Sequence, residues 1–170
     1  LRAVGMVADL MCLAARTAPK ARGVDLIVTA ILEGETKKKL ASRMRELASS
    51  GGEWFLERDA GNVEASAAVV LIGTRGRRLG LRGCGLCGSS DCDAAARAGV
   101  LCAFNLHDLG VAVGSAVSVA ALHHVDNRVM FSIGRAALGS DLLPPDVIMA
   151  VGIPLSATGK NIFFDRPPRA

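Results

Sequence analysis

Residues Ala67 to Gly73 read Ala-Ala-Val-Val-Leu-Ile-Gly, an uncharged run with the length of one strand. Val69, Val70 and Ile72 are β-branched, and such residues favour the pleated backbone of a sheet. A run that is apolar at every position is typical of a strand covered on both faces. We therefore expect this segment to be a central strand, with the other elements arranged around it.

Apolar periodicity divides the rest of the chain into helices and strands. Helices are expected at Val4 to Ala15, Glu33 to Ser50, Asp93 to Ala98, Leu109 to His124 and Arg135 to Leu143. Further strands are expected at Asp25 to Leu32, at Val147 to Val151 and, in a short form, within Val125 to Ile133. There is no internal repeat, low-complexity block or linker, so residues 1–170 are expected to form a single domain.

Smaller features complete this prediction. Asp108 belongs to a residue type that often caps helices, and we expect it to cap the helix that follows it. Trp54 to Leu56 is expected to be a packing anchor, followed by a polar turn at Arg58 to Asn62. The chain from Gly152 onward is expected to be an extended tail.

A cysteine-rich loop, residues 83–104, begins just beyond the central strand. Cys84, Cys87, Cys92 and Cys102 follow the spacing Cys-x2-Cys-x4-Cys-x9-Cys, so four of the five cysteines lie in one short stretch. Glycines flank the first pair, and they let the backbone turn tightly and bring amide groups near sulfur. Folds with mixed helices and strands commonly bind ligands beyond the ends of core strands. The pattern favours an iron–sulfur cluster held by these four thiolates.

Other uses of these cysteines stay open. Disulfides suit small secreted scaffolds, which neither the five cysteines nor the composition indicates. A structural zinc ion also takes four thiolates, usually from two Cys-x-x-Cys pairs, and only Cys84 and Cys87 have that spacing. A cluster is wider than one ion and suits a loop that wraps around it. Zinc and redox-active free thiols remain the alternatives.

Composition argues against several classes of partner. The net charge is +4, tyrosine is absent, and the five Phe and one Trp are not interleaved with a basic stripe, so no nucleic acid is expected. No uninterrupted apolar run is long enough to span a bilayer, and no membrane is expected. The apolar run Leu1 to Ala15 is interrupted by Asp9 but keeps helical periodicity, which favours a buried helix over a signal peptide. We expect a cytoplasmic protein.

Several segments of this chain appear in an order that matches a known family. They are Ala15 to Asp25, Arg58 to Asn62, Cys84 to Gly88, Cys102 to Asn105, Asp108 to Ala116, Val125 to Arg128 and Gly152 to Arg166. Together they resemble the uncharacterised prokaryotic ferredoxin-domain-containing proteins, over nearly the whole chain. The cysteine stretch is also similar to the small 4Fe-4S domain of electron-transfer and corrinoid-linked proteins. That domain has a longer interval before its last cysteine, so Cys102 departs most from the pattern.

A second resemblance is to the flavin-dependent nitroreductases. Ala18-Pro19-Lys20 before a strand looks like their Ala-Pro-Ser stretch, and Gly114 to Pro154 looks like their small-residue helix, glycine-rich turn and closing Gly-(Tyr/Ile)-Pro. This resemblance implies an α+β fold, a three-layer sheet with helices, here carrying an inserted Cys-rich loop. It also implies a homodimer with a helical interface and an FMN site between subunits. Lys20 replaces their serine, no matching asparagine follows, and their Arg-Ser-x-Arg motif is not present.

A flavin phosphate needs basic or amide groups around it. Arg16, Lys20, Arg128 and Lys160 are the candidates, together with Asn127, which follows the long helix where the nitroreductase resemblance places the cofactor. Surface ion pairs, or a capped turn at Asn127 and Arg128, are the competing interpretation.

The histidines and the fifth cysteine are weaker candidates. His107 is near Cys102, whereas His123 and His124 are expected to stabilise a helix end. Cys12 is expected to be a small buried hydrophobe. The sequence therefore predicts a 4Fe-4S redox or electron-transfer protein with an unknown partner. The alternatives are an FMN-dependent oxidoreductase and a zinc-stabilised interaction protein, and whether the protein is an enzyme stays open.

Overall fold

The computed structural model describes residues 2–164 of the chain. Within these residues the centre is a four-stranded sheet with the order β1-β2-β4-β3, and each neighbouring pair is antiparallel. The strands are β1 (Ile27–Leu32), β2 (Ala68–Arg75), β3 (Asp126–Asn127) and β4 (Val147–Ser156). β2 lies between β1 and β4, and every residue from Ala68 to Thr74 is buried. The expectation of a central strand is confirmed.

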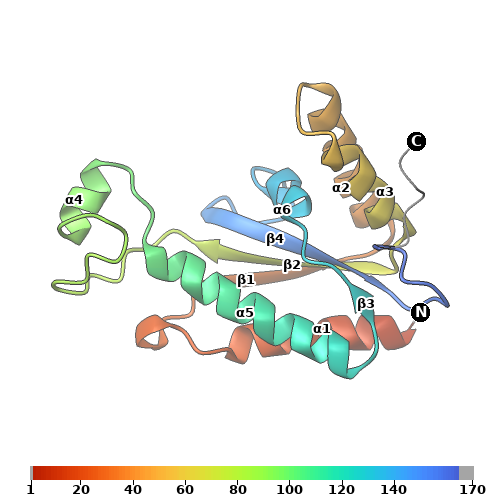
Figure 1. Ribbon diagram of the computed structural model, residues 1–170, viewed down its shortest axis with the longest axis horizontal. Helices are drawn as coiled ribbons and strands as arrows, with labels where there is room; N and C mark the ends of the chain where they lie inside the picture. The colour runs from red at the N-terminus through yellow and green to blue at the C-terminus, as the bar shows by residue number, and fades with distance from the viewer. Residues whose placement is uncertain (1, 165–170) are drawn as a thin grey trace.

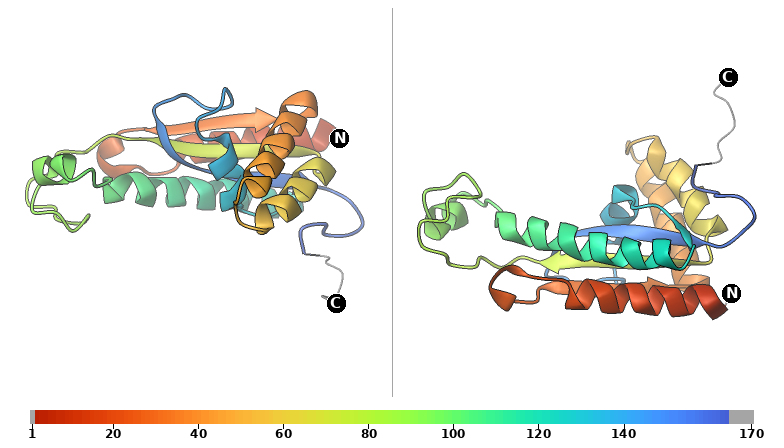
Figure 2. Two further views of the ribbon diagram at one scale, coloured as in Figure 1. Left: turned by 90° about the horizontal axis from the view of Figure 1, so that it is seen from above. Right: turned by 60° about the horizontal axis from the view of Figure 1, so that its bottom comes forward.

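Helices cover both faces of this sheet (Figures 1 and 2). One layer consists of α1 (Arg2–Thr17) and α5 (Ala103–Leu122), and the other of α2 (Gly34–Ser49), α3 (Phe55–Ala65) and α6 (Phe131–Ala137). Since side chains alternate along a strand, Val70 and Ile72 of β2 join the core cluster under α1 and α5, while Val69 and Leu71 join the one under α2, α3 and α6. The three-layer α+β fold is therefore confirmed.

Helix α5 has the length and composition of a membrane-spanning helix. Core helices of soluble proteins share these properties, and 33% of its most apolar window is buried inside the protein. Ala112, Ala116 and Ala120 lie every fourth residue along α5 and are buried in the cluster that includes Met11 of α1. Alanine side chains on this face let α5 pack close to α1.

The cysteine-rich loop lies beyond one end of the sheet (Figure 1). It leaves the end of β2, contains the short helix α4 (Cys92–Arg97), and returns to the start of α5. Arg78 holds the loop together, because its guanidinium donates hydrogen bonds to the carbonyls of Ala95 (3.3 Å) and Val100 (3.2 Å). Arg22 donates a hydrogen bond of 2.8 Å to the carbonyl of Leu79, in the segment that leads from β2 into the loop.

Helix α3 was not expected from the sequence. The prediction of a polar turn at Arg58 to Asn62 is wrong, since these residues lie inside α3. Trp54, expected to be a packing anchor, has 61% of its surface exposed and precedes the helix. The helix packs through Leu56, Ala60 and Val63, which recur at helical spacing and are buried.

Three element boundaries also differ from the prediction. Helix α5 begins at Ala103 and is preceded by Cys102, so Asp108 is not its cap. Helix α6 spans Phe131–Ala137, earlier than expected. Strand β4 continues to Ser156, so the first part of the expected tail belongs to the sheet, where Pro154 pairs with Val69.

Candidate metal centre

The four cysteines of the cysteine-rich loop line a single pocket. Cys84 and Cys87 come from the glycine-rich segment, Cys92 is the first residue of α4, and Cys102 immediately precedes α5. The pocket walls are mainly apolar, and they include Leu81, Leu86, Ala95, Ala103 and Phe104. Three separate segments therefore bring four thiols to the same place.

The thiols do not converge on one point in this conformation. In the part of the chain that the structure describes, no three His, Cys, Asp or Glu side chains are gathered closely enough to hold one metal ion. The space left in the pocket is about 30 Å³, which is room for roughly one or two water molecules. All five cysteines are free thiols. A group as large as a cluster would require the loop to open around it.

Backbone geometry in the glycine-rich segment depends on glycine. Gly85 and Gly88 have φ angles of 57° and 82°, a region that other residues adopt only with strain. The amide of Gly88 donates a hydrogen bond to the carbonyl of Gly85 at 2.9 Å, which closes a tight turn containing Cys87. The turn brings Cys84 and Cys87 to the same pocket.

Local hydrogen bonds favour the thiolate form of Cys87. The backbone amide and the hydroxyl of Ser89 lower the pKa of the Cys87 thiol, and the nearby Arg78 guanidinium contributes in the same direction. A thiolate is the form of cysteine that binds metals. Ser89 was not singled out from the sequence, although a serine two residues after a cysteine in a glycine-rich turn is a signal that could have found it.

Cys102 lies at a position that suits a negative charge. It precedes the first turn of the 20-residue helix α5, and no side chain caps that end of the helix. The amide groups at a helix N-terminus are unpaired within the helix and carry partial positive charge. An anionic group held by Cys102 would be stabilised by these amides.

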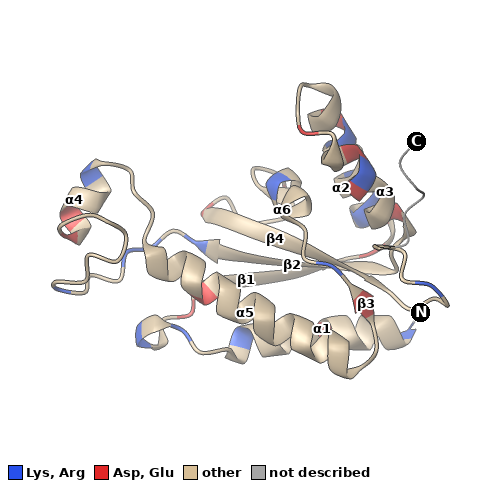
Figure 3. Ribbon diagram, viewed as in Figure 1, with Lys and Arg blue, Asp and Glu red and all other residues tan. Residues whose placement is uncertain are grey.

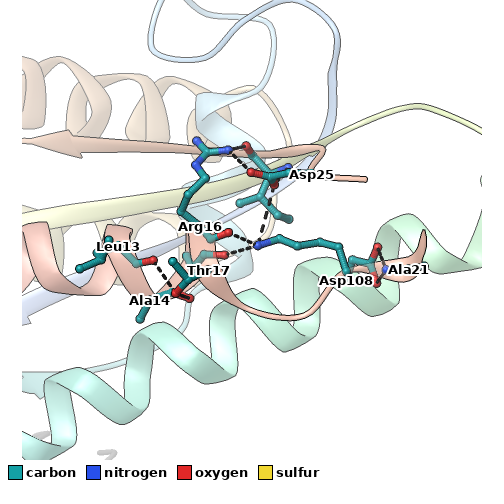
Figure 4. Close-up of polar contacts among 10 residues, drawn as sticks. Leu13, Ala14, Arg16, Thr17, Ala21, Asp25 and Asp108 are labelled. Carbon is teal, nitrogen blue, oxygen red and sulfur yellow. Dashed lines mark hydrogen bonds and ion pairs between the residues drawn. The ribbon is translucent and has the colours of Figure 1, made fainter. Parts of the chain in front are cut away.

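Two of the expected flavin residues make internal contacts instead (Figure 4). Arg16 donates hydrogen bonds to the carboxylate of Asp25 at 2.7 Å and to the carbonyl of Ile27 at 2.6 Å. The amine of Lys20 donates to the carbonyls of Ala15 (2.8 Å) and Arg16, so it closes the end of α1. Burial lowers the pKa of Lys20, and its side chain is only 5% exposed.

The other expected flavin residues lie at the opposite end of the sheet. The strand register shows this. The Arg16–Lys20 segment leads to Ile27, which pairs with Thr74 at one end of the sheet. Asn127 pairs with Leu155 at the other end. Asn127 donates to the carbonyl of Val125 at 3.0 Å. Arg128 donates to the carbonyl of Phe163 at 3.4 Å and lies over the ring of Phe164. Lys160 belongs to the same end, where its carbonyl accepts a hydrogen bond of 2.6 Å from Thr158. One chain therefore does not bring these five residues to one site.

The histidines do not join the thiol pocket. The Nδ1 atom of His107 lies 3.3 Å from the carboxylate of Asp108, and its side chain is largely exposed. His123 and His124 follow the end of α5, and His124 adopts a φ of 56° that ends the helix. Cys12 is half-buried on α1, where burial raises the pKa of its thiol.

Comparison with known proteins gives one matching family description and one full-length relative. Residues 98–166 match the family described as "Uncharacterized protein containing a ferredoxin domain". An uncharacterized protein of Archaeoglobus fulgidus is 41% identical over 174 residues, which is 98% of this chain and 93% of the relative. The match therefore extends over nearly the whole chain and is not confined to residues 98–166.

The fold is similar to that of solved flavoproteins. An oxidoreductase containing FMN superposes with a TM-score of 0.64 at 11% identity, covering 91% of this chain and 67% of that chain. A nitroreductase with bound FMN from Desulfitobacterium hafniense gives 0.62 at 12% identity, with coverages of 97% and 81%. A BluB-like flavoprotein from Clostridium difficile gives 0.59 at 10% identity, with coverages of 97% and 84%. At these identities the likeness establishes a nitroreductase-like fold.

Proposed function

Because the chain belongs to the family of uncharacterized proteins containing a ferredoxin domain, we propose that it is a redox protein that binds one 4Fe-4S cluster. Cys84, Cys87, Cys92 and Cys102 are the ligands in this proposal. The family description supports iron–sulfur chemistry, and the nitroreductase-like fold is one that solved redox proteins share.

The observation that carries the proposal is that four thiols from three segments line one pocket with apolar walls. Thiolate is the ligand that iron–sulfur clusters use, and apolar surroundings with amide donors tune their potential. Histidine and carboxylate side chains also bind metals in proteins, and among the residues that line this pocket Asp91 is the only one of these types. The donor set therefore fits an iron–sulfur cluster in its chemistry.

The residues around the pocket have defined parts in this proposal. Ser89 and Arg78 favour the thiolate of Cys87, and the N-terminus of α5 favours negative charge at Cys102. Arg78 also anchors α4 and the turn after it, and Arg22 holds the carbonyl of Leu79 before the loop. When bound, the cluster would accept and donate single electrons.

An absorption spectrum of protein purified without oxygen tests the proposal. We expect brown protein with a broad visible band that bleaches on reduction. A yellow protein that releases FMN on denaturation contradicts the cluster and supports the flavin alternative. A colourless protein with one zinc per chain also contradicts it and supports a structural metal.

FMN-dependent oxidoreduction is the second candidate function, because solved proteins with a similar fold are described as containing or binding FMN. The flavin site would have to form between two chains, since Arg16 and Lys20 lie at one end of the sheet and Asn127, Arg128 and Lys160 at the other. The internal contacts of Arg16 and Lys20 favour the cluster over the flavin as the primary cofactor.

We also propose that the protein is a homodimer that pairs through the layer of α1 and α5. Met6, Leu10 and Leu13 follow one another at helical spacing on α1, and each has at least 40% of its surface exposed. Gly110, Gly114 and Ser118 present a small-sided face on α5, exposed in the same layer. A second copy would cover this apolar surface.

The setting of the protein is part of the proposal. Five free thiols suit a reducing compartment, and we assign the protein to the cytoplasm with a redox partner still to be identified. We propose no nucleic-acid or membrane partner.

A further inference from the structure

Residues of α2, α3 and α6 and of the segment between α2 and α3 line a second pocket. These three helices cover one face of the sheet, away from the cysteine-rich loop (Figure 1). Its volume is about 310 Å³, which falls in the range of small-molecule sites. Apolar side chains from the three helices line it, namely Leu47, Phe55, Leu56 and Phe131. Glu53 and Arg135 add one charge of each sign.

The orientation of α6 fixes two of these side chains. Gly134 faces the sheet so closely that a Cβ atom would lie 1.8 Å from the carbonyl oxygen of Ala150. On the same buried face, the hydroxyl of Ser132 donates a hydrogen bond of 2.5 Å to the carboxylate of Asp59. Phe131 and Arg135 are four residues apart and exposed, so they share the opposite face of α6. The fold therefore holds both side chains at the pocket.

Aromatic side chains gather around this pocket. Phe131 is 58% exposed, Phe55 is half-buried, and Trp54 is 61% exposed with its ring 6.2 Å from that of Phe55. These are three of the six aromatic residues in a chain without tyrosine. Clustered exposed aromatics cost solvation free energy, and such clusters mark binding surfaces.

The guanidinium of Arg135 lies at the same pocket as the aromatic rings and, within the part of the chain that the structure describes, is not paired with another side chain. It is the only basic residue of α6, and it appears in blue on that helix in Figure 3. Among residues 2–164, no hydrogen bond or ion pair to its guanidinium occurs, and Glu53 is not within ion-pair distance of it. A guanidinium binds a carboxylate through two parallel hydrogen bonds.

We propose that this pocket binds a small carboxylate with an aromatic ring. The ring packs between Phe55 and Phe131 over Leu47 and Leu56, and the carboxylate pairs with Arg135. Glu53 repels ligands that carry a second negative charge on the opposite side. The site is separate from the thiol pocket, so it does not depend on whether a cluster binds.

The experiment uses 3-phenylpropionate and its uncharged analogue 3-phenyl-1-propanol as probes. Trp54 is the only tryptophan and lies beside Phe55, so its fluorescence reports occupancy of the pocket. We expect a saturable change with the carboxylate, and an affinity for the alcohol that is roughly tenfold weaker because the charge-assisted hydrogen bonds are absent.

Variants separate this site from unspecific binding. Arg135→Gln should weaken the affinity for 3-phenylpropionate by roughly tenfold, and Phe131→Ala should weaken the affinity for both probes. The matched control Arg97→Gln, an exposed arginine on α4, should leave both affinities unchanged. The absence of saturable binding to the wild type, or equal affinities of the wild type and Arg135→Gln, would overturn the proposal.

Discussion

The carboxylate of Asp108 accepts hydrogen bonds from the backbone amide of Ala21 at 3.1 and 3.2 Å, across 87 residues of sequence. Asp108 is buried in α5, and Ala21 begins the 3-10 turn between α1 and β1 (Figure 4). This contact joins the basic segment after α1 to α5, the helix that begins immediately after Cys102. It explains why an aspartate lies inside a helix and not at its cap.

Replacement of Asp108 tests this connection. Asp108→Ala leaves the amide of Ala21 without its acceptor, so the free energy of unfolding should fall by about 1–3 kcal/mol in urea denaturation. Asp108→Asn keeps an acceptor and should cost less. The exposed Asp141→Ala is the control and should be neutral. Equal stability of Asp108→Ala and Asp141→Ala would contradict the role of this contact.

Thiol reactivity tests the environment of Cys87. Its pKa is lowered by the hydrogen bonds of Ser89, so its thiolate forms at lower pH and iodoacetamide should modify it before Cys12, whose thiol pKa burial raises. Ser89→Ala removes the hydroxyl donor but keeps the amide, and should move the alkylation curve of Cys87 to higher pH. Mass spectrometry of digested protein follows each site. An unchanged curve in Ser89→Ala would show that the hydroxyl has no influence.

Two helical glycines should respond in opposite ways to alanine. Gly134→Ala places a methyl group against the carbonyl of Ala150 and should lower the free energy of unfolding by about 1–3 kcal/mol or more. Gly61→Ala on α3 meets no atom within 4 Å and should raise it by about 0.5–1 kcal/mol. Thermal or urea unfolding of both variants makes the comparison. Tolerance of Gly134→Ala would mean that α6 does not pack as described.

If the protein is a homodimer that pairs through α1 and α5, a charged residue on the exposed face of α1 should lower its molar mass in solution. Leu13→Glu puts a charge into the exposed apolar face and should convert dimer to monomer in light scattering. Leu86→Glu, equally exposed but on the cysteine-rich loop, should leave the dimer intact. A monomeric wild type at micromolar concentration would exclude this interface.

The sequence predicted the centre of the fold well because burial on both faces leaves a clear pattern. Val69 and Leu71 face one core cluster and Val70 and Ile72 the other, so β2 has no polar side chain from Ala68 to Gly73. Helix α3 was missed because Arg58, Asp59 and Asn62 read as a turn, although Leu56, Ala60 and Val63 follow helical spacing. The start of α5 was misplaced because Cys102 is not a usual cap residue.

The candidate site was predictable only in part. Cysteine spacing identified the residues that line the thiol pocket, since they lie close together in the chain. The contacts of Arg16 and Lys20 with Asp25 and the end of α1 depend on how α1 meets β1, which sequence spacing does not encode. The same holds for Arg135 and Phe55, which line one pocket only because α3 and α6 pack against each other.

Iron and acid-labile sulfide analysis of protein purified without oxygen tests the central claim most directly. The account predicts about four iron and four sulfide per chain, with the iron content reduced in Cys84→Ser, Cys87→Ser, Cys92→Ser and Cys102→Ser. Cys12→Ser, outside the thiol pocket, should retain the full amount. Wild-type protein that holds no iron after anaerobic reconstitution, or iron that survives in all four loop variants, would contradict the account.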